Sequence, residues 1–190
     1  MAKLSELGLG QSIFRCTHQK CQELFIGNYK LLDRAEGGRP AYSLQSVAPV
    51  KAQSVIFPDT VVTTSPTFAM VFNQSVAAES AGLDQLVGIG LRKALEFLIK
   101  DYAILEQPEK TDEIRSTQLA ACISSYVSDP NVKECAKRAA WLGNDETHYT
   151  RKWEAKDVND LKLLVKLTVN WIDNALLTKK YIAEMSAGKS

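Results

Sequence analysis

The feature that most constrains the fold is the apolar periodicity that begins at Ser65 and continues almost to the end of the chain. Ser65-Pro66 is a typical helix start, because hydroxyl side chains cap helices and proline is favoured at the first helical position. Beyond it, apolar residues recur with the period of a helix that has one buried face. The clearest stripe comprises Leu86, Val87, Leu91, Ala94, Leu95, Leu98 and Tyr102. This pattern predicts a mainly α protein.

We expect about five helices with short connections, which is typical of a helical bundle. Their expected ranges are 66–82, 84–102, 111–127, 130–142 and 158–185. Asp129-Pro130 repeats the helix start, Asp157 is expected to cap the last helix, and Gly143 is expected to end the fourth. Gly88 and Gly90 each cost about 1 kcal/mol of helix stability relative to Ala, so they indicate a close helix–helix approach.

Each helix is expected to have an inner and an outer side. The last helix should bury Leu161, Leu164, Val165, Thr168, Trp171, Ile172, Ala175 and Leu176. On the second helix, Arg92, Glu96 and Lys100 are four residues apart, as in an exposed ladder of ion pairs. Cys122 and Cys135 are expected to face the core of the bundle.

The first 65 residues lack this periodicity and are expected to form a small β-rich segment, separate from a helical domain at 66–190. Glu36-Gly37-Gly38-Arg39-Pro40 is a turn signal, so the runs on either side of it are expected to pair as a hairpin. Two later runs flank Pro58, which limits any strand there to a short or edge strand. The expected extended runs are Ser12–Arg15, Phe25–Leu32, Ala41–Val47, Val55–Phe57 and Thr60–Thr64.

Cys16, His18 and Cys21 lie close together in this segment, with the soft ligands of a zinc site. A structural zinc site needs four ligands, usually as two pairs, and a second pair is missing here. The segment therefore resembles a degenerate zinc ribbon, and we expect a turn with free thiols and no bound metal. A zinc-dependent nucleic-acid binder remains an alternative.

Composition limits the classes of function. The chain has 23 basic and 22 acidic residues, a formal net charge of +1, whereas general nucleic-acid binders usually have a basic excess. It has no apolar run of the roughly 18 residues that a membrane helix needs, and no apolar segment of a secretory signal near its first residue. We therefore expect a cytoplasmic protein that does not associate with membranes.

The most distinctive stretch is Trp141–Tyr149, where a helix end meets a polar loop. Histidine is the usual acid or base near neutral pH, so His148 could have that role. Asn144 could hold a turn or donate to an anion, and Asp145 and Glu146 could orient the imidazole. The alternative is ordinary turn chemistry at a helix terminus. His148 and Asn144 are the candidate catalytic residues, and Trp141, Asp145, Tyr149 and Arg138 are the candidate binding residues.

The aromatic residues near this loop allow two interpretations. Trp141, Tyr149, Trp153 and Trp171 could stack a nucleic-acid base, although such residues more often pack in a core or at its rim, which we expect here. The sequence has no glycine-rich phosphate loop, no serine nucleophile elbow and no paired-carboxylate metal motif. We expect no cofactor and no metal.

Two stretches, Gly88–Leu98 and Trp141–His148, carry a resemblance to a known family. They resemble the family catalogued as domain of unknown function 4145, and the chain is similar to the wider HEPN superfamily of helical bundles. HEPN ribonucleases place a phosphate-holding Arg a few residues before a catalytic His. The corresponding positions here are Trp141, Leu142 and Gly143, so the resemblance supports the fold and argues against the nuclease.

The resemblance implies a non-catalytic, HEPN-like binding or regulatory module in prokaryotic or phage biology, associated with defence or mobile elements. It implies a homodimer, with a protein or RNA as the further partner. The alternative is a metal-independent ribonuclease that uses His148 and recruits Arg138 or Arg151 across a dimer interface.

Overall fold

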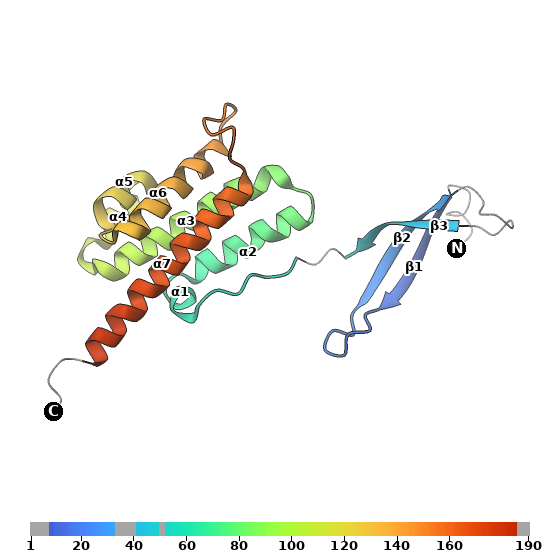
Figure 1. Ribbon diagram of the computed structural model, residues 1–190, viewed down its shortest axis with the longest axis horizontal. Helices are drawn as coiled ribbons and strands as arrows, with labels where there is room; N and C mark the ends of the chain where they lie inside the picture. Colours follow the sequence, from blue (N-terminus) through green and yellow to red (C-terminus); the bar gives the residue numbers. More distant parts are fainter. Residues whose placement is uncertain (1–7, 33–40, 50–51, 186–190) are drawn as a thin grey trace. The chain divides into compact units, whose positions relative to one another are not determined.

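The computed structural model describes residues 8–32, 41–49 and 52–185, which divide into two compact units. The first unit spans Met1–Lys51 and carries a small antiparallel sheet, and the second spans Ala52–Ser190 and is helical (Figure 1). The expectation of a mainly helical chain with a small β-rich N-terminal part is confirmed. The division falls after Lys51, earlier than the expected boundary at Ser65.

The sheet has the strand order β1-β2-β3, formed by β1 (Leu9–Arg15), β2 (Leu24–Leu32) and β3 (Ala41–Ala48). The expected hairpin is confirmed, because β2 and β3 pair antiparallel. Gly27 lies opposite Ser12 and is buried under aromatic rings: a Cβ there would lie 2.8 Å from the Tyr29 ring and 3.1 Å from the Phe14 ring. This glycine therefore allows the rings to cover the sheet.

The segment that follows is helical where strands were expected. Asp59–Thr64 forms α1, and Val61 within it is fully buried. Phe57, just before it, packs its ring 4.8 Å from that of Phe68 and 5.1 Å from that of Phe72. The prediction of an extended run at Thr60–Thr64 was wrong, because packing against the bundle overrides the preference of its threonines and valines for strands. Val55–Phe57 is neither helix nor strand.

Helix α3 (Asp84–Glu106) is the central element, and α1, α2 (Pro66–Ser80) and the helices that follow α3 in the chain all pack against it. Both helices begin where the sequence predicts, but the Ser65 hydroxyl donates to Asp101 Oδ2 on α3 and does not cap α2. Gly90 faces α2, where an added Cβ would lie 2.2 Å from Ser75 Oγ, and at Gly88 it would lie 2.3 Å from Glu146 Cβ. The expected close approach is confirmed, and it occurs within one chain.

The single helix expected at 111–127 is two helices. A short 3-10 helix, η1 (Pro108–Lys110), precedes α4 (Thr111–Ser116), and α5 (Leu119–Tyr126) follows after a break. At the break, the Ser116 and Thr117 hydroxyls donate to the carbonyl of Glu113, and both Thr117 and Gln118 have extended backbones. Hydroxyl side chains that bond to the preceding turn compete with the continuing helix.

Helix α6 (Pro130–Asp145) begins as expected, with the Asp129 carboxylate accepting hydrogen bonds from the N–H groups of Asn131 and Val132 at 2.9 Å. It continues past Gly143, so the expected stop there was wrong. Gly143 is buried, and a Cβ on it would lie 2.9 Å from Arg92 Cβ on α3. This glycine serves a close contact between two helices.

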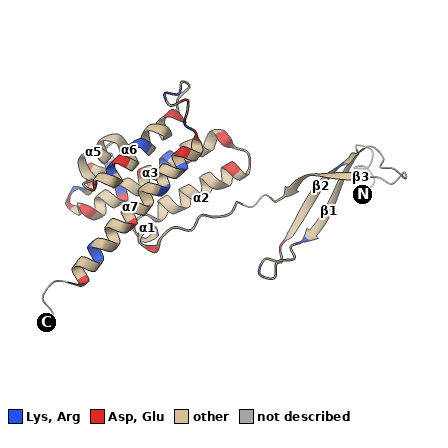
Figure 2. Ribbon diagram, viewed as in Figure 1, with Lys and Arg blue, Asp and Glu red and all other residues tan. Residues whose placement is uncertain are grey.

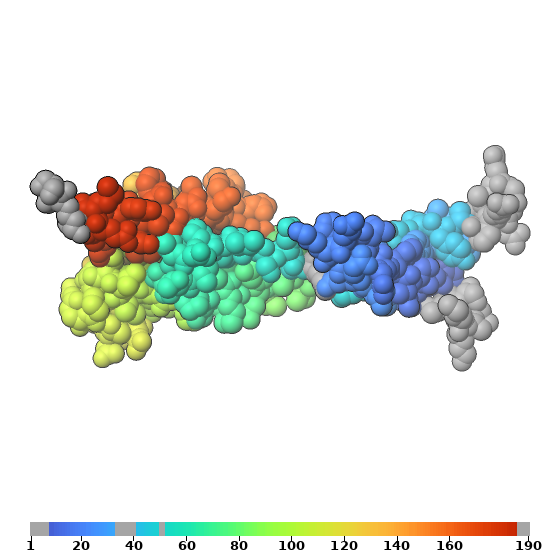
Figure 3. Space-filling model, turned by 90° about the horizontal axis from the view of Figure 1, so that it is seen from below, coloured from blue at the N-terminus to red at the C-terminus, as the bar shows by residue number. Residues whose placement is uncertain are grey.

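Helix α7 (Val158–Glu184) starts with a capping box between Asp157 and Asp160. It buries Leu161, Val165, Thr168, Val169 and Ile172, but Trp171 is 39% exposed, contrary to the expected buried face. Every residue from Thr178 to Met185 is exposed. Helix α7 lies beside α1, as Figures 1 and 3 show. Among the described residues, no helix is both long and apolar enough to cross a membrane.

Candidate functional site

A buried carboxylate shapes the loop between α6 and α7. Asp145, at the end of α6, is 5% exposed, and its Oδ2 accepts hydrogen bonds from Lys152 N at 2.8 Å and Trp153 N at 2.6 Å. Arg151 Nη2 donates to the carbonyl of Lys156 and lies 2.9 Å from Glu146 Oε1. The loop is thereby folded back onto the end of α6.

This fold of the loop places Trp153 on Trp141. The two indole rings are nearly parallel, with an interplanar angle of 9° and centroids 6.0 Å apart. Trp141 is 39% exposed and Trp153 is 45% exposed. Lys137 Nζ lies 5.4 Å from the Trp141 ring centroid, within the range of a cation–π contact. The two rings pack against each other at the edge of the bundle, and part of each indole stays exposed.

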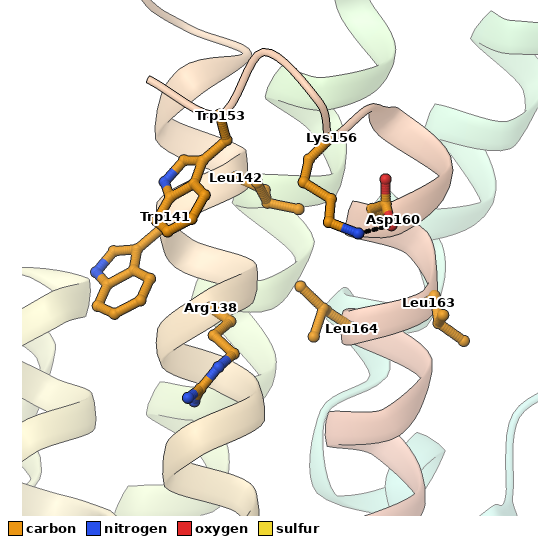
Figure 4. A pocket seen from close by; sticks show the side chains of 8 residues that line it. All are labelled: Arg138, Trp141, Leu142, Trp153, Lys156, Asp160, Leu163 and Leu164. Carbon is orange, nitrogen blue, oxygen red and sulfur yellow. Dashed lines mark hydrogen bonds and ion pairs between the residues drawn. The ribbon is translucent and has the colours of Figure 1, made fainter. Parts of the chain in front are cut away.

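The tryptophan pair borders a hollow between α6 and α7 of about 380 Å³, which we call the tryptophan groove (Figure 4). The residues that line it are Arg138, Trp141, Leu142, Trp153, Lys156, Asp160, Leu163 and Leu164. Its charged residues are held in place by ion pairs: Arg138 with Glu134, and Lys156 Nζ with Asp160 Oδ1 at 3.0 Å. The groove is a largely apolar surface with a fixed polar rim.

Asn144 faces a different side of α6. Arg92 Nε donates to its Oδ1 at 2.6 Å, while Arg92 Nη1 lies 3.6 Å from Glu96 Oε2 and Lys100 Nζ lies 3.0 Å from Glu96 Oε1. The expected ladder of ion pairs is present, but its three side chains are half-buried rather than exposed. Burial raises the pKa of Glu96, but the hydrogen bond and charge of Lys100 outweigh that effect, so the pKa lies below its usual value. Both stretches of the family resemblance meet at this contact.

His148 and Tyr149 lie exposed on the loop. The backbone N–H of His148 donates to the carbonyl of Asp145 at 3.4 Å, and its imidazole has no hydrogen bond to any described residue. Asn144 bonds to Arg92, and the Asp145 carboxylate bonds to the loop backbone. The structure does not bring these side chains together around the imidazole.

Of the residues predicted from the sequence, Arg138 and Trp141 meet in the groove, and Asp145 supports it through the loop. Trp153 was grouped with Trp141 from the sequence as a possible stacking residue. The Arg92 partner of Asn144 and the other residues that line the groove were not among the candidate site residues: Leu142, Lys156, Asp160, Leu163 and Leu164. A signal for Leu163 was present, because Leu163, Leu167 and Trp171 recur every fourth residue, as a second stripe beside the buried one.

The cysteine-containing segment forms the turn between β1 and β2. Cys21 N donates to the carbonyl of His18 at 3.0 Å, and Gln22 has a positive φ of 52°. Cys16, Cys21 and Cys135 are free thiols, as is the buried Cys122. Within the described ranges, no three His, Cys, Asp or Glu side chains are grouped so that they could hold a metal ion.

The arrangement is suited to binding. An apolar groove with two exposed indoles and a few fixed polar groups has the composition typical of binding sites. We compared the chain with protein-family models, curated proteins and solved structures, and none of the three comparisons gives a match.

Proposed function

We propose that this chain is a non-catalytic binding module with a HEPN-like helical bundle, and that the tryptophan groove is its binding surface. The observation that carries the proposal is the exposed stack of Trp141 and Trp153, held by the buried Asp145. The cytoplasmic homodimer in prokaryotic or phage defence that the resemblance implies belongs to the same proposal.

The hydrogen bonds that hold the loop beside the groove favour a function for its exposed indoles. Hydrogen bonds to a charged acceptor contribute about 1.5–3 kcal/mol each, and Asp145 uses two of them to keep an indole at the surface. Contiguous apolar surface that stays exposed in a folded protein typically marks an interaction site. Such a fixed, exposed ring pair loses little conformational freedom when a ligand binds.

The surroundings of His148 favour a module without catalysis. A general acid or base works efficiently when a neighbouring group orients it toward the reacting atoms. Here Asn144 is engaged by Arg92, Asp145 by the loop backbone, and Glu146 by Arg151. In the part of the chain that the structure describes, no side chain orients the imidazole.

The second candidate is a metal-independent ribonuclease that uses His148. The observation in its favour is the position of Arg151, on the same loop as the exposed imidazole, with a buried Nε that has no hydrogen-bond partner in the described structure. A rearranged loop or a second copy would have to bring the guanidinium to the substrate phosphate.

An RNA-cleavage assay in the presence of EDTA separates the two candidates. Wild type, His148→Ala and Thr150→Ala are compared on a mixed-sequence single-stranded RNA, with Thr150→Ala as the control at an exposed residue of the same loop. We expect no cleavage by any of the three. Cleavage by wild type and Thr150→Ala that disappears in His148→Ala would overturn the proposal and establish the ribonuclease.

A further inference from the structure

The tryptophan groove continues into a row of exposed apolar residues on α7. Leu163 lines the groove, and Leu167 and Trp171 follow at intervals of four residues, with 56%, 37% and 39% of their surfaces exposed. At about 1.5 Å per residue, this apolar row extends about 12 Å along the helix. The groove and the row form one elongated surface on α7, whose neighbour along the groove is α6 (Figure 1).

The lining of the groove is suited to side-chain anchors. Leu142, Leu163 and Leu164 line it together with the indoles of Trp141 and Trp153, as Figure 4 shows. A nucleic-acid base would need an unoccupied aromatic face. The two indoles already stack on each other, and Lys137 lies against Trp141, so the leucines are left to receive aliphatic or aromatic groups.

The charges around this surface are predominantly positive. Lys137 and Lys166 lie on α6 and α7 beside the groove and the apolar row, and neither has an ion-pair partner among the described residues. Of the carboxylates nearby, Glu134 and Asp160 are paired with Arg138 and Lys156, Asp157 caps α7, and Glu154 lies exposed on the loop. Figure 2 shows that basic and acidic residues both occur along these helices. The surface is complementary to a ligand with an excess of carboxylates.

We infer that the tryptophan groove and the apolar row dock an acidic amphipathic helix of a partner protein, an inference that rests on the proposed binding function. A helix with apolar residues one turn apart matches the spacing of Leu163, Leu167 and Trp171. Its anchors enter the groove beside the leucines, and its glutamates and aspartates lie along Lys137 and Lys166. Tryptophan at the centre of such a groove is the residue type that most often dominates binding.

The test measures binding of a designed peptide to the full chain by fluorescence anisotropy. The probe has about 18 residues, or five helical turns, with Leu and Phe at i, i+4, i+7 and i+11 and Glu at the outward positions. A second peptide carries Lys in place of each Glu, and a third probe is an oligouridine of about 12 nucleotides, enough to follow a stacking groove. The variants are Trp141→Ala and Lys137→Glu, with Tyr181→Ala, at an exposed ring near the end of α7, and Lys93→Glu as matched controls outside the groove and the apolar row.

We expect the acidic peptide to bind, the Lys peptide to bind at least about tenfold more weakly, and Trp141→Ala to weaken binding at least about tenfold. Lys137→Glu should weaken binding and reduce its dependence on salt, because it removes an attraction across the interface. Tyr181→Ala and Lys93→Glu should bind within about twofold of wild type, and circular dichroism should show that all variants keep their helices.

Three results would overturn the inference. One is oligouridine binding that depends on Trp141 while the peptide does not bind, and another is no binding of any probe. The third is a dimer in sedimentation that Trp141→Ala dissociates and the peptide does not disrupt, since a second copy would then cover the groove. RNA cleavage that is lost in His148→Ala would instead overturn the proposed function, so the two failures are distinguishable.

Discussion

Asp145→Ala tests whether the buried carboxylate holds the tryptophan stack. The change removes two hydrogen bonds to a charged acceptor, at 2.6 and 2.8 Å, together with the support for the ring stack. Hydrogen bonds to charged groups contribute about 1.5–3 kcal/mol each, and an aromatic pair about 0.5–1.5 kcal/mol beyond its buried area. The exposed N–H groups of residues 152 and 153 regain water when the loop opens. We therefore expect the free energy of unfolding to fall by about 2–4 kcal/mol.

Two measurements read the effect. Urea unfolding followed by tryptophan fluorescence reports on the helical unit alone, because Trp141, Trp153 and Trp171 all lie within it. The exciton signal of the stacked indoles in circular dichroism should disappear in Asp145→Ala, since the rings separate when the loop opens. Acrylamide should also quench the fluorescence more strongly than in wild type.

Two further variants calibrate the result. Asp145→Asn keeps an acceptor oxygen but loses the charge, so it should lie between wild type and Asp145→Ala. Asp112→Ala removes an exposed carboxylate on α4 and should change the free energy of unfolding by less than about 0.5 kcal/mol. An unchanged urea midpoint and an intact exciton signal in Asp145→Ala would refute the reasoning.

Three more predictions concern the fold. Gly90→Ala should lower the free energy of unfolding by about 1–2 kcal/mol, because overpacking against Ser75 exceeds the gain in helix propensity. Ser75→Ala in the same chain should recover most of this loss, as measured by urea unfolding in a double-mutant cycle. Backbone hydrogen bonds from Asp160 and Asn159 hold the pKa of Asp157 below its usual value. The Asp157 carboxylate therefore stabilises the fold above its unfolded pKa, and this stabilisation is lost as the pH falls through its folded pKa. Asp157→Asn should flatten the acid side of a plot of melting temperature against pH. A chain of residues 52–190 should melt like the helical unit of the full chain, whereas residues 66–190, which lack α1 and its buried valine, should melt at least about 5 °C lower in calorimetry.

The sequence predicted the elements whose signals are local. The helix starts at Pro66, Asp84, Pro130 and Val158 follow from caps, prolines and apolar stripes that lie within a few residues of each other. The helix at 59–64 was missed because it depends on packing of Val61 and Phe57 against distant residues. Short segments of β-branched residues give no local sign of such packing.

The same distinction applies to the candidate site. Asn144, Asp145 and Trp141 could be selected because they lie in one distinctive stretch of sequence. Their partners could not, because Arg92 is 52 residues from Asn144, and the pairing requires that α3 and α6 cross at Gly143. Gly143, which was predicted from the sequence to end a helix, is the residue that permits this crossing.

The uneven burial of α7 has a consequence for hydrogen exchange. Its amides around Leu161 to Ile172 are covered by the core, so they should exchange only when the whole helical unit unfolds. Every residue from Thr178 to Met185 is exposed, and the ion pair of Lys179 with Glu106 is at the surface, where such pairs add at most about 1 kcal/mol. The amides of this one continuous helix should therefore differ in protection. Those in its buried part exchange through global unfolding, and those in its last turns exchange through local fraying.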